Sequence, residues 1–399
     1  MRVALFTDSD VFAGTERHIL ELACGLGTLG CEAALACPSH GELARRADAL
    51  AIPVVPVPKR GRIDWQAALW LRNALRQDKF DLIHVHNGRT ALIGAVGLRL
   101  AGVGRLVATQ HFIEPSRLRR RGAARMAAAW LHRRVEQRVD RFIAISRAVR
   151  DAMVARGDAA PDKISVVSNG ISAPEPAWLP APEQIRRELD VGAGERLIVC
   201  AARLEAEKDV ITLIDAMARV RATCPEAICA IAGDGSQRDR LKSRVRELAL
   251  ERNVRLLGFR TDVLGIIAAT DLLVLPSLAE PFGLVILEAM ALGKPVIATA
   301  AGGPPDIVAA GETGLLVPPA VPTALADAIV ELIRDDQRCL RMGEGGRKRF
   351  EAHFTARHMA AATLAVYRQV LAEHPCPAPK SSDARRPALA AEGRSDVAR

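Results

Sequence analysis

Aromatic side chains are scarce in this chain of 399 residues, which has nine Phe, four Trp and a single Tyr. The chain therefore lacks the interleaved basic and aromatic positions by which many proteins stack on single-stranded nucleic acids. We expect no nucleic-acid partner, although the net charge of +9 would suit one. The same charge suits an acidic lipid surface or a phosphorylated small molecule, and charge alone does not choose between them.

Paired cysteines and long apolar runs are also missing. The eight cysteines are scattered without C-x-x-C spacing, so we expect reduced, mostly buried thiols and no structural zinc. The apolar run Ala91–Leu98 is interrupted by Arg99 and is too short to span a membrane. Residues Arg2–Phe6 have the pattern of a β-strand and are too short for the apolar core of a signal peptide. We expect a cytoplasmic protein, at most peripheral on the inner face of the plasma membrane.

Short apolar runs alternate with amphipathic stretches, and several runs are nearly continuous in Val, Ile and Leu, as strands buried on both faces are. The first set of predicted strands is Arg2–Phe6, Glu32–Cys37, Val54–Pro56, Leu82–His86, Leu106–Thr109, Arg141–Ile145 and Ile164–Val167. The second set is Arg196–Ala201, Ala227–Ala232, Val254–Leu257, Leu272–Leu275, Pro295–Ala298 and Gly314–Val317. Alternation of this kind predicts an α/β fold with two Rossmann-like domains, each built on a parallel sheet.

A cluster of four prolines within Ser172–Pro182 separates the two sets and predicts an extended linker. We therefore place an N-terminal domain at 1–172, a linker at 173–190 and a C-terminal domain at 191–352. A last helix is predicted at about 357–372, and the tail 375–399, rich in Pro, Ala, Ser and Arg, is expected to be disordered.

The most specific motif is Glu280-Pro-Phe-Gly-Leu-Val-Ile-Leu-Glu288, which follows a predicted buried strand. A helix opening near Leu284 would put Glu288 about two turns beyond Glu280, so both carboxylates can flank one ligand. The amides of Phe282–Leu284 would lie at the helix N-terminus, a favourable place for an anion. Taken singly, Glu280 can be an acid favoured by the helix dipole and Glu288 a solvated helix residue. The whole pattern after a buried strand favours a ligand site.

Two cations, Arg203 and Lys208, follow the strand Arg196–Ala201. Ligands of open α/β sheets bind at the carboxyl ends of strands, and an Arg fork beside a Lys point charge suits a diphosphate. The alternative is a solvated charged loop. The position at the end of a strand favours the diphosphate.

In the first domain the candidates are a glycine and two histidines. Gly14, between the first strand and the first helix, would let the backbone approach a phosphate, although a plain helix start explains it as well. His86 and His111 end predicted strands and are candidates for polar contacts to a sugar or acceptor, or else structural hydrogen bonders. Asp8-Ser-Asp10 has the form of a metal-binding D-x-D element. Such short acidic matches are common, and we expect no metal.

Together these stretches resemble the family-four retaining glycosyltransferases, which have the GT-B fold, over roughly residues 1–372. The matching stretches are Ala13–His18, His84–His86, Ala108–His111, Val167–Gly170, Arg203–Lys208, Gly233–Gly235, Glu280–Glu288 and Gly302–Asp306. Ala13, Ser172 and Asp306 depart from the residues common at these positions, whereas Gly14 is intact. The E-x7-E motif with its P-F-G centre is the specific one, and the others occur in the family's order.

The resemblance implies a donor site mainly on the second domain and an acceptor site on the first. Arg203 and Lys208 would hold the diphosphate and Glu288 the ribose hydroxyls, while Glu280 would meet the donor sugar together with the backbone of Phe282, Gly283 and Leu284. Gly258, Phe259 and Arg260 would lie near the base, Gly14 near the diphosphate, and His111 at the sugar and acceptor. Catalysis would retain configuration without a metal or other cofactor, with the nucleotide-sugar as co-substrate. The last helix would pack back on the first domain.

Two alternatives remain at this point: an epimerase of GT-B shape, acting on the donor alone, and a non-catalytic sugar-nucleotide-binding protein. The acceptor would be a glycan or lipid-linked hydroxyl, as in synthesis of cell-envelope polysaccharide or glycolipid such as lipopolysaccharide. The arginine-rich stretch Arg117–Arg138 could form a basic amphipathic helix that binds an anionic membrane surface, or a solvated helix packed on the sheet.

Overall fold

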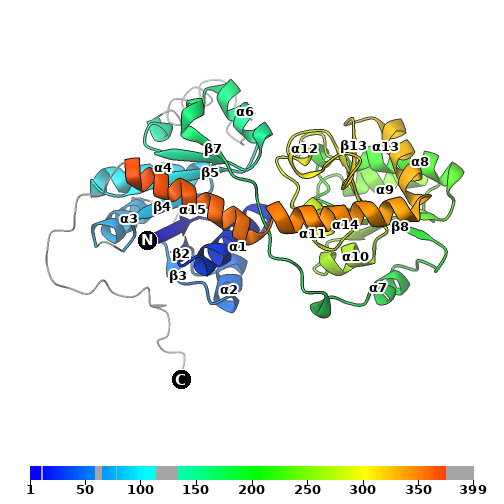
Figure 1. The fold of residues 1–399 in the computed structure, drawn as a ribbon, viewed down its shortest axis with the longest axis horizontal. Coiled ribbons are helices and arrows are strands. Elements are labelled where there is room, and N and C mark those ends of the chain that lie inside the picture. The colour runs from blue at the N-terminus through cyan, green and yellow to red at the C-terminus, as the bar shows by residue number, and fades with distance from the viewer. Residues whose placement is uncertain (10–11, 59–64, 78, 114–133, 374–399) are drawn as a thin grey trace. The chain divides into compact units, whose positions relative to one another are not determined.

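The computed structural model describes residues 1–9, 12–58, 65–77, 79–113 and 134–373. The chain divides into two compact units, which are described separately. Unit 1 comprises Met1–Gly170 and the chain from Ala356 onward, and unit 2 comprises Ile171–Thr355 (Figure 1). The predicted tail 375–399 and most of the basic stretch, 117–133, lie outside the described residues.

Unit 1 is built on a seven-stranded parallel sheet of order β3-β2-β1-β4-β5-β6-β7. Its strands are β1 (Arg2–Phe6), β2 (Glu32–Cys37), β3 (Val54–Pro56), β4 (Leu82–Val85), β5 (Arg105–Gln110), β6 (Arg141–Ala144) and β7 (Ile164–Val166). Strands β1 and β4 are buried along their whole length, which explains why they read as continuous apolar runs.

Six described helices flank this sheet. They are α1 (Gly14–Thr28), α2 (Glu42–Ala49), α3 (Trp65–Arg76), α4 (Gly88–Ala101), α6 (Arg147–Arg156) and α15 (Ala356–Glu373). The last of them, α15, returns to unit 1 and packs on α1 (Figure 1). A Cβ at Gly25 of α1 would come within 2.6 Å of the Ala356 carbonyl oxygen, so this close approach requires glycine.

Unit 2 is built on a six-stranded parallel sheet of order β10-β9-β8-β11-β12-β13. Its strands are β8 (Arg196–Ala201), β9 (Ala227–Ala232), β10 (Val254–Gly258), β11 (Leu272–Leu275), β12 (Val296–Thr299) and β13 (Gly314–Val317). Its helices are α7 (Pro182–Glu188), α8 (Val210–Thr223), α9 (Arg238–Glu247), α10 (Val263–Ala269), α11 (Leu284–Ala291), α12 (Pro304–Ile307), α13 (Pro322–Ile333) and α14 (Asp336–His353). The predicted pair of parallel Rossmann-like sheets is therefore confirmed.

The proline-rich stretch differs from the extended linker that its composition predicted. The segment predicted as a linker, 173–190, contains a short 3-10 turn at Pro176–Trp178 and the helix α7, whose Ile185 is buried. Pro182 stands at the first position of α7, where proline costs no hydrogen bond. Helix α7 packs on α10, and the whole predicted linker, 173–190, belongs to unit 2.

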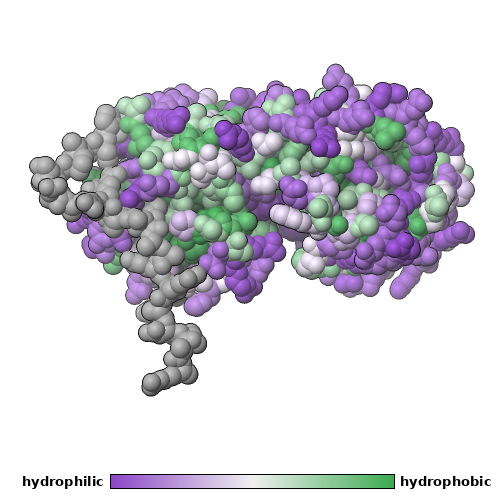
Figure 2. Space-filling view, turned by 60° about the horizontal axis from the view of Figure 1, so that its bottom comes forward, coloured by the Kyte–Doolittle hydropathy of each residue, from purple (hydrophilic) through white to green (hydrophobic). Residues whose placement is uncertain are grey.

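The face shown in Figure 2 carries many hydrophilic side chains, with hydrophobic residues gathered between them. Seven cysteines lie in the described part of the chain as free thiols, five of them buried, as predicted. No helix among the described residues is long and apolar enough to cross a membrane.

Candidate active site

Each sheet has one point at which the strand order reverses, between β1 and β4 in unit 1 and between β8 and β11 in unit 2. Ligands of open parallel sheets bind beyond the carboxyl ends of the strands at such a point. In unit 2 the two strands lead into Lys208 and Glu280. In unit 1 they lead into α1 and into His86, so the predicted site residues gather where the topology favours a ligand.

The centre of the unit 2 site is an ion pair. Lys208 Nζ lies 2.5 Å from Glu280 Oε2, and the two side chains are only 15% and 8% exposed. Ser277 Oγ donates a hydrogen bond of 3.1 Å to the same carboxylate oxygen. A buried charge is tolerated only when it is paired and hydrogen-bonded, and here each partner meets that condition through the other. The sequence did not predict a role for Ser277, because serine is common in turns. Its role follows only from the hydrogen bond to Glu280.

The backbone of Glu280 is fixed from the neighbouring loop. Its amide donates to the Ala301 carbonyl at 3.1 Å, and its carbonyl accepts from the Gly303 amide at 2.7 Å. A Cβ on Gly303 would stand 2.6 Å from Phe282 Cα, so only glycine allows the two loops to lie this close. The Gly302–Asp306 stretch therefore holds the carboxylate loop in place.

Helix α11 begins directly after this loop. Gly283 precedes it with φ of 104°, a conformation that favours glycine, and Leu284 is its first residue. Glu288 follows one turn later and is buried, as Glu280 is. A solvated helix glutamate would be exposed, so that alternative for Glu288 is wrong. Phe282 is also buried, which leaves its backbone rather than its ring available to a ligand.

The second predicted cation is placed differently from the first. Arg203 follows β8 with its side chain 63% exposed, and it pairs with Glu207 at 2.9 Å. An exposed pair of this kind contributes little to stability and is easily exchanged for a ligand anion. The loop itself is held closely, since a Cβ on Gly233 would stand 1.9 Å from the Ala202 carbonyl oxygen. The Lys208 side chain is therefore held in one place by burial and its ion pair, whereas the exposed Arg203 side chain can move.

The stretch predicted to lie near the base ends β10. Gly258 has φ of 72° at the end of the strand, and Phe259 after it is 76% exposed. Arg260 lies in salt bridges with Asp262 and Glu188, both at 2.6 Å, which raise the pKa of its guanidinium. The Arg260 guanidinium is already paired with two carboxylates, whereas the Phe259 ring is exposed and can stack on a ligand.

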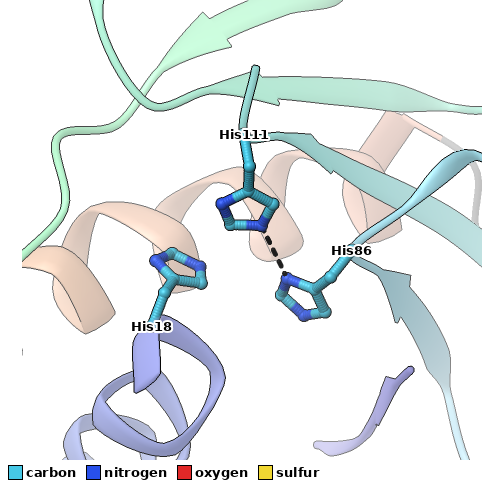
Figure 3. A group of neighbouring side chains, drawn as sticks. All are labelled: His18, His86 and His111. Carbon is cyan, nitrogen blue, oxygen red and sulfur yellow. Dashed lines mark hydrogen bonds between the residues drawn. The ribbon is translucent and has the colours of Figure 1, made fainter. Parts of the chain in front are cut away.

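Unit 1 brings His86 and His111 together with a third histidine, His18 of α1 (Figure 3). His86 Nδ1 lies 3.4 Å from His111 Nε2. The ring of His18 has its centroid 5.5 Å from that of His86 and 4.8 Å from that of His111. All three side chains are buried. His18 belongs to the stretch Ala13–His18 that resembles the family, but the sequence assigns it no role. It lies one turn into α1, the helix that follows β1, and therefore at the same edge of the sheet as His86.

Burial keeps these three rings neutral. Burial lowers the pKa of His18 to about 4, although the hydrogen-bonding side chain of Asn169 acts in the opposite direction and raises it. The pKa values of His86 and His111 are lowered well below 6.5, first by burial and then by the other histidines of the group. Each neutral ring has one donor and one acceptor nitrogen, and one donor and one acceptor are already used by the hydrogen bond between His86 Nδ1 and His111 Nε2.

His84, in β4, has a structural environment instead. Its Nδ1 lies 2.6 Å from the hydroxyl of Tyr367 on α15, and its Nε2 lies 2.7 Å from the hydroxyl of Thr109. All three groups are buried, and both ring nitrogens are satisfied. The network fastens α15 to the centre of the sheet and leaves His84 no capacity for a ligand.

The remaining candidates in unit 1 lie at the start of the sheet. Gly14 is the first residue of α1, as its motif predicted. Asp8 accepts hydrogen bonds from Asn87 at 2.9 Å and from Arg89 at 2.7 Å, so its carboxylate has partners other than a metal. Asp10, the other acid of the D-x-D element, lies outside the described residues.

Comparison with known proteins identifies this architecture. The family described as Glycosyltransferase Family 4 matches residues 12–173, and the family described as Glycosyl transferases group 1 matches residues 182–349. An alpha-maltose-1-phosphate synthase from Mycolicibacterium smegmatis is 31% identical over 93% of this chain and 100% of its own length. The chain belongs to the family-four glycosyltransferases. Its relatives also include a D-inositol 3-phosphate glycosyltransferase from Corynebacterium glutamicum, 33% identical over 83% of this chain and 86% of that protein.

Solved structures agree with the family-four fold. The Anabaena protein HepE, solved in complex with UDP-glucose, superposes with a TM-score of 0.79 at 24% identity, covering 92% of this chain and all of HepE. The lipopolysaccharide outer core galactosyltransferase WaaB superposes with a TM-score of 0.69 at 19% identity, over 92% and 100%. Membership of this glycosyltransferase family favours sugar transfer over the epimerase and the non-catalytic alternatives.

Proposed function

We propose that this glycosyltransferase moves a sugar from a nucleoside diphosphate-sugar to an acceptor hydroxyl, with retention of configuration and without a catalytic metal. The observation that carries the proposal is the buried Lys208–Glu280 pair with Ser277, at the carboxyl ends of β8 and β11. A fixed ammonium at this position suits a ligand that carries concentrated negative charge, as a diphosphate does.

The chemistry follows from these groups. The bond between the anomeric carbon and the diphosphate breaks, and the charge that develops on the leaving phosphate is stabilised by Lys208, by Arg203 and by the N-terminus of α11. A bond from the acceptor oxygen forms on the same face of the sugar, and the acceptor proton passes to the departing phosphate. Glu280 orients Lys208 and accepts hydrogen bonds from the sugar hydroxyls. Glu288 takes the ribose.

Other parts of the chain would bind the base and the acceptor. The exposed ring of Phe259 would stack on the base, beside Gly258 and Arg260. Gly14 would approach the diphosphate, and His86 and His111, neutral in unit 1, would donate to and accept from sugar or acceptor hydroxyls. HepE, which shares the fold, was solved with UDP-glucose, and we propose a UDP-hexose as the first donor to test.

Two acceptor classes are candidates. The names of the relatives above contain maltose 1-phosphate and inositol 3-phosphate, which favours a small phosphorylated sugar or polyol. The alternative is a glycan or lipid-linked hydroxyl in cell-envelope polysaccharide or lipopolysaccharide synthesis, with the chain in the cytoplasm and its stretch Arg117–Arg138 on the anionic inner face of the plasma membrane. Sedimentation with anionic vesicles at varied salt tests this alternative, and no sedimentation at low salt would reject the membrane contact.

The donor proposal is tested by a thermal-shift screen of UDP-, GDP- and ADP-sugars on the wild-type chain. The donor found is then used with candidate acceptors, with chelator present, while nuclear magnetic resonance follows the anomeric proton of the first product. Lys208→Met should reduce the thermal shift and slow transfer by about 10²–10³. Arg347→Gln is the matched control, because Arg347 forms an exposed ion pair with Glu351 on α14. An inverted product, or transfer that chelator abolishes, would contradict the mechanism.

A further inference from the structure

Arg238, the first residue of α9, is a cation of unit 2 that the proposed mechanism does not use. A Cβ at Gly258 would stand 3.5 Å from Arg238 Nη2 and 4.0 Å from its Cζ, so the guanidinium lies against the backbone of Gly258. Phe259, the next residue along the chain, is 76% exposed. The guanidinium therefore lies beside the stretch that is proposed to bind the base of the donor.

The position of Arg238 is fixed by hydrogen bonds between neighbouring loops. The amide of Gln237, directly before Arg238, donates to the Leu204 carbonyl at 2.9 Å. The Gly233 amide, in the loop that precedes α9, donates to the Gly258 carbonyl at 2.8 Å. The start of α9 is thereby tied both to the loop after β8 and to the end of β10, so the side chain starts from a well-defined place.

The order of the strands separates the two ends of a nucleotide. Strand β9 lies between β8 and β10 in the sheet of unit 2. Neighbouring strands are about 4.8 Å apart, so the ends of β8 and β10 are separated by about 10 Å. A diphosphate bound at Lys208, in the loop after β8, would direct its ribose and base across the end of β9 toward Gly258. Arg238 lies at the base end of this path.

The guanidinium of Arg238 can donate more hydrogen bonds than the chain accepts from it. An arginine side chain has five N–H donors in one plane and no acceptor. Arg238 Nη1 donates to Asp234 Oδ2 at 3.0 Å, whereas its Nε is buried without a hydrogen-bond partner in the structure. The side chain as a whole is 40% exposed, which leaves it accessible to a ligand. Arg260, by contrast, is already paired with two carboxylates.

We propose that Arg238 is a specificity-determining residue, which donates hydrogen bonds to the carbonyl oxygen of a keto base, uracil or guanine, in the donor. Uracil O4 and guanine O6 are acceptors, whereas cytosine and adenine carry an amino donor at the corresponding place. Because arginine has no acceptor for an amino group, the site binds a UDP- or GDP-sugar in preference to a CDP- or ADP-sugar. This inference rests on the proposed donor function and names the class of base that the donor carries.

The test compares UDP with CDP, two nucleotides of the same size whose bases differ in the group at position 4. Isothermal titration calorimetry on the full wild-type chain should show that UDP binds more tightly than CDP by roughly 10-fold or more. Arg238→Met should bring this ratio of affinities close to one, mainly by weakening UDP. Arg240→Met is the matched control, because it removes an exposed arginine of the same helix, and it should keep the wild-type ratio.

Two further variants separate the possible outcomes. Arg238→Gln keeps a polar side chain that can both donate and accept, so it should also bring the ratio close to one, and it decides the test if Arg238→Met does not fold. Lys208→Met should weaken UDP and CDP alike, because both carry the same diphosphate.

The ratio of affinities is the readout that decides. If the wild-type chain binds neither nucleotide, the proposed donor function fails, and this inference fails with it. If the wild-type chain binds UDP and CDP equally, or if the folded Arg238 variants keep a preference for UDP, this inference alone is overturned and the donor function stands.

Discussion

Lys208 Nζ and Glu280 Oε2 lie 2.5 Å apart although their residues are separated by 72 positions, and both side chains are almost fully buried. The pair joins the loops after two adjacent strands, β8 and β11. Among the described residues, Glu280 is the carboxylate that forms an ion pair with the Lys208 ammonium. The position of the ammonium therefore depends on Glu280.

The first prediction concerns the two members of this pair. Lys208→Met should lower kcat/KM by about 10²–10³, since it removes a cation aimed at developing phosphate charge. Glu280→Gln should cost about 2–4 kcal/mol in the free energy of unfolding as well, because it leaves a buried ammonium unpaired. Release of nucleotide diphosphate and urea unfolding measure the two effects. Near-wild-type turnover in both variants would refute the site.

The second prediction concerns the close approach of two loops. Gly303→Ala would place a Cβ 2.6 Å from Phe282 Cα and from the Pro281 carbonyl oxygen, which forces the Glu280 loop to shift. We expect a loss of about 1–3 kcal/mol and weaker donor binding. Gly194→Ala is the control, since its Cβ meets nothing within 4 Å, and it should change stability by no more than about 0.5 kcal/mol. Equal effects of the two substitutions would contradict this account.

How far the sequence predicts such a site depends on the kind of signal. The strands of both sheets were predictable because burial on both faces demands apolar runs, and Lys208 and Glu280 were placed near one another by their positions at strand ends. His18 was not, because the direction of a helical side chain depends on how α1 packs on the sheet. The same limit applies to α7, because its packing on α10 and the burial of Ile185 depend on tertiary contacts that the composition of the stretch does not reveal.

The exposure of the two cationic side chains could not be predicted from the sequence either. Arg203 and Lys208 belong to one motif, yet one is 63% exposed and the other 15%. The difference arises because Lys208 pairs with the carboxylate of Glu280, which lies in the loop after β11 and is 72 positions away in the sequence. A pattern of residue types carries no information on such a partner, so the motif suggested equal roles where the structure gives unequal ones.

The third prediction uses the single tyrosine of the chain, Tyr367. Tyr367→Phe should cost about 1–3 kcal/mol in the stability of unit 1, because it leaves His84 Nδ1 buried without its partner. Burial also raises the pKa of the Tyr367 hydroxyl well above 10. In the wild type, tyrosinate absorbance should therefore appear only when unit 1 unfolds at alkaline pH. Ionisation near pH 10 in the folded chain would contradict the buried network.

The fourth prediction is a loss of stability of unit 1 in mild acid. In the folded chain the pKa of His18 is lowered to about 4, and those of His84, His86 and His111 are lowered well below 6.5, chiefly by burial. The unfolded chain binds protons on these rings as the pH falls through about 6.5, and the folded chain does not. The free energy of unfolding must therefore decrease as the pH falls from about 7.5 toward 4.

Hydrogen exchange resolved by peptide, corrected for the intrinsic effect of pH, can measure this loss between pH 7.5 and 5.5, where ordinary carboxylates stay ionised. Peptides of β4 and β5 should lose protection, whereas peptides of β8 and β11 should keep it, since unit 2 has no buried histidine. His18→Leu should make the decrease shallower by up to one proton, because its ring no longer takes part. An equal loss in both units would mean that other groups control the acid sensitivity of this chain.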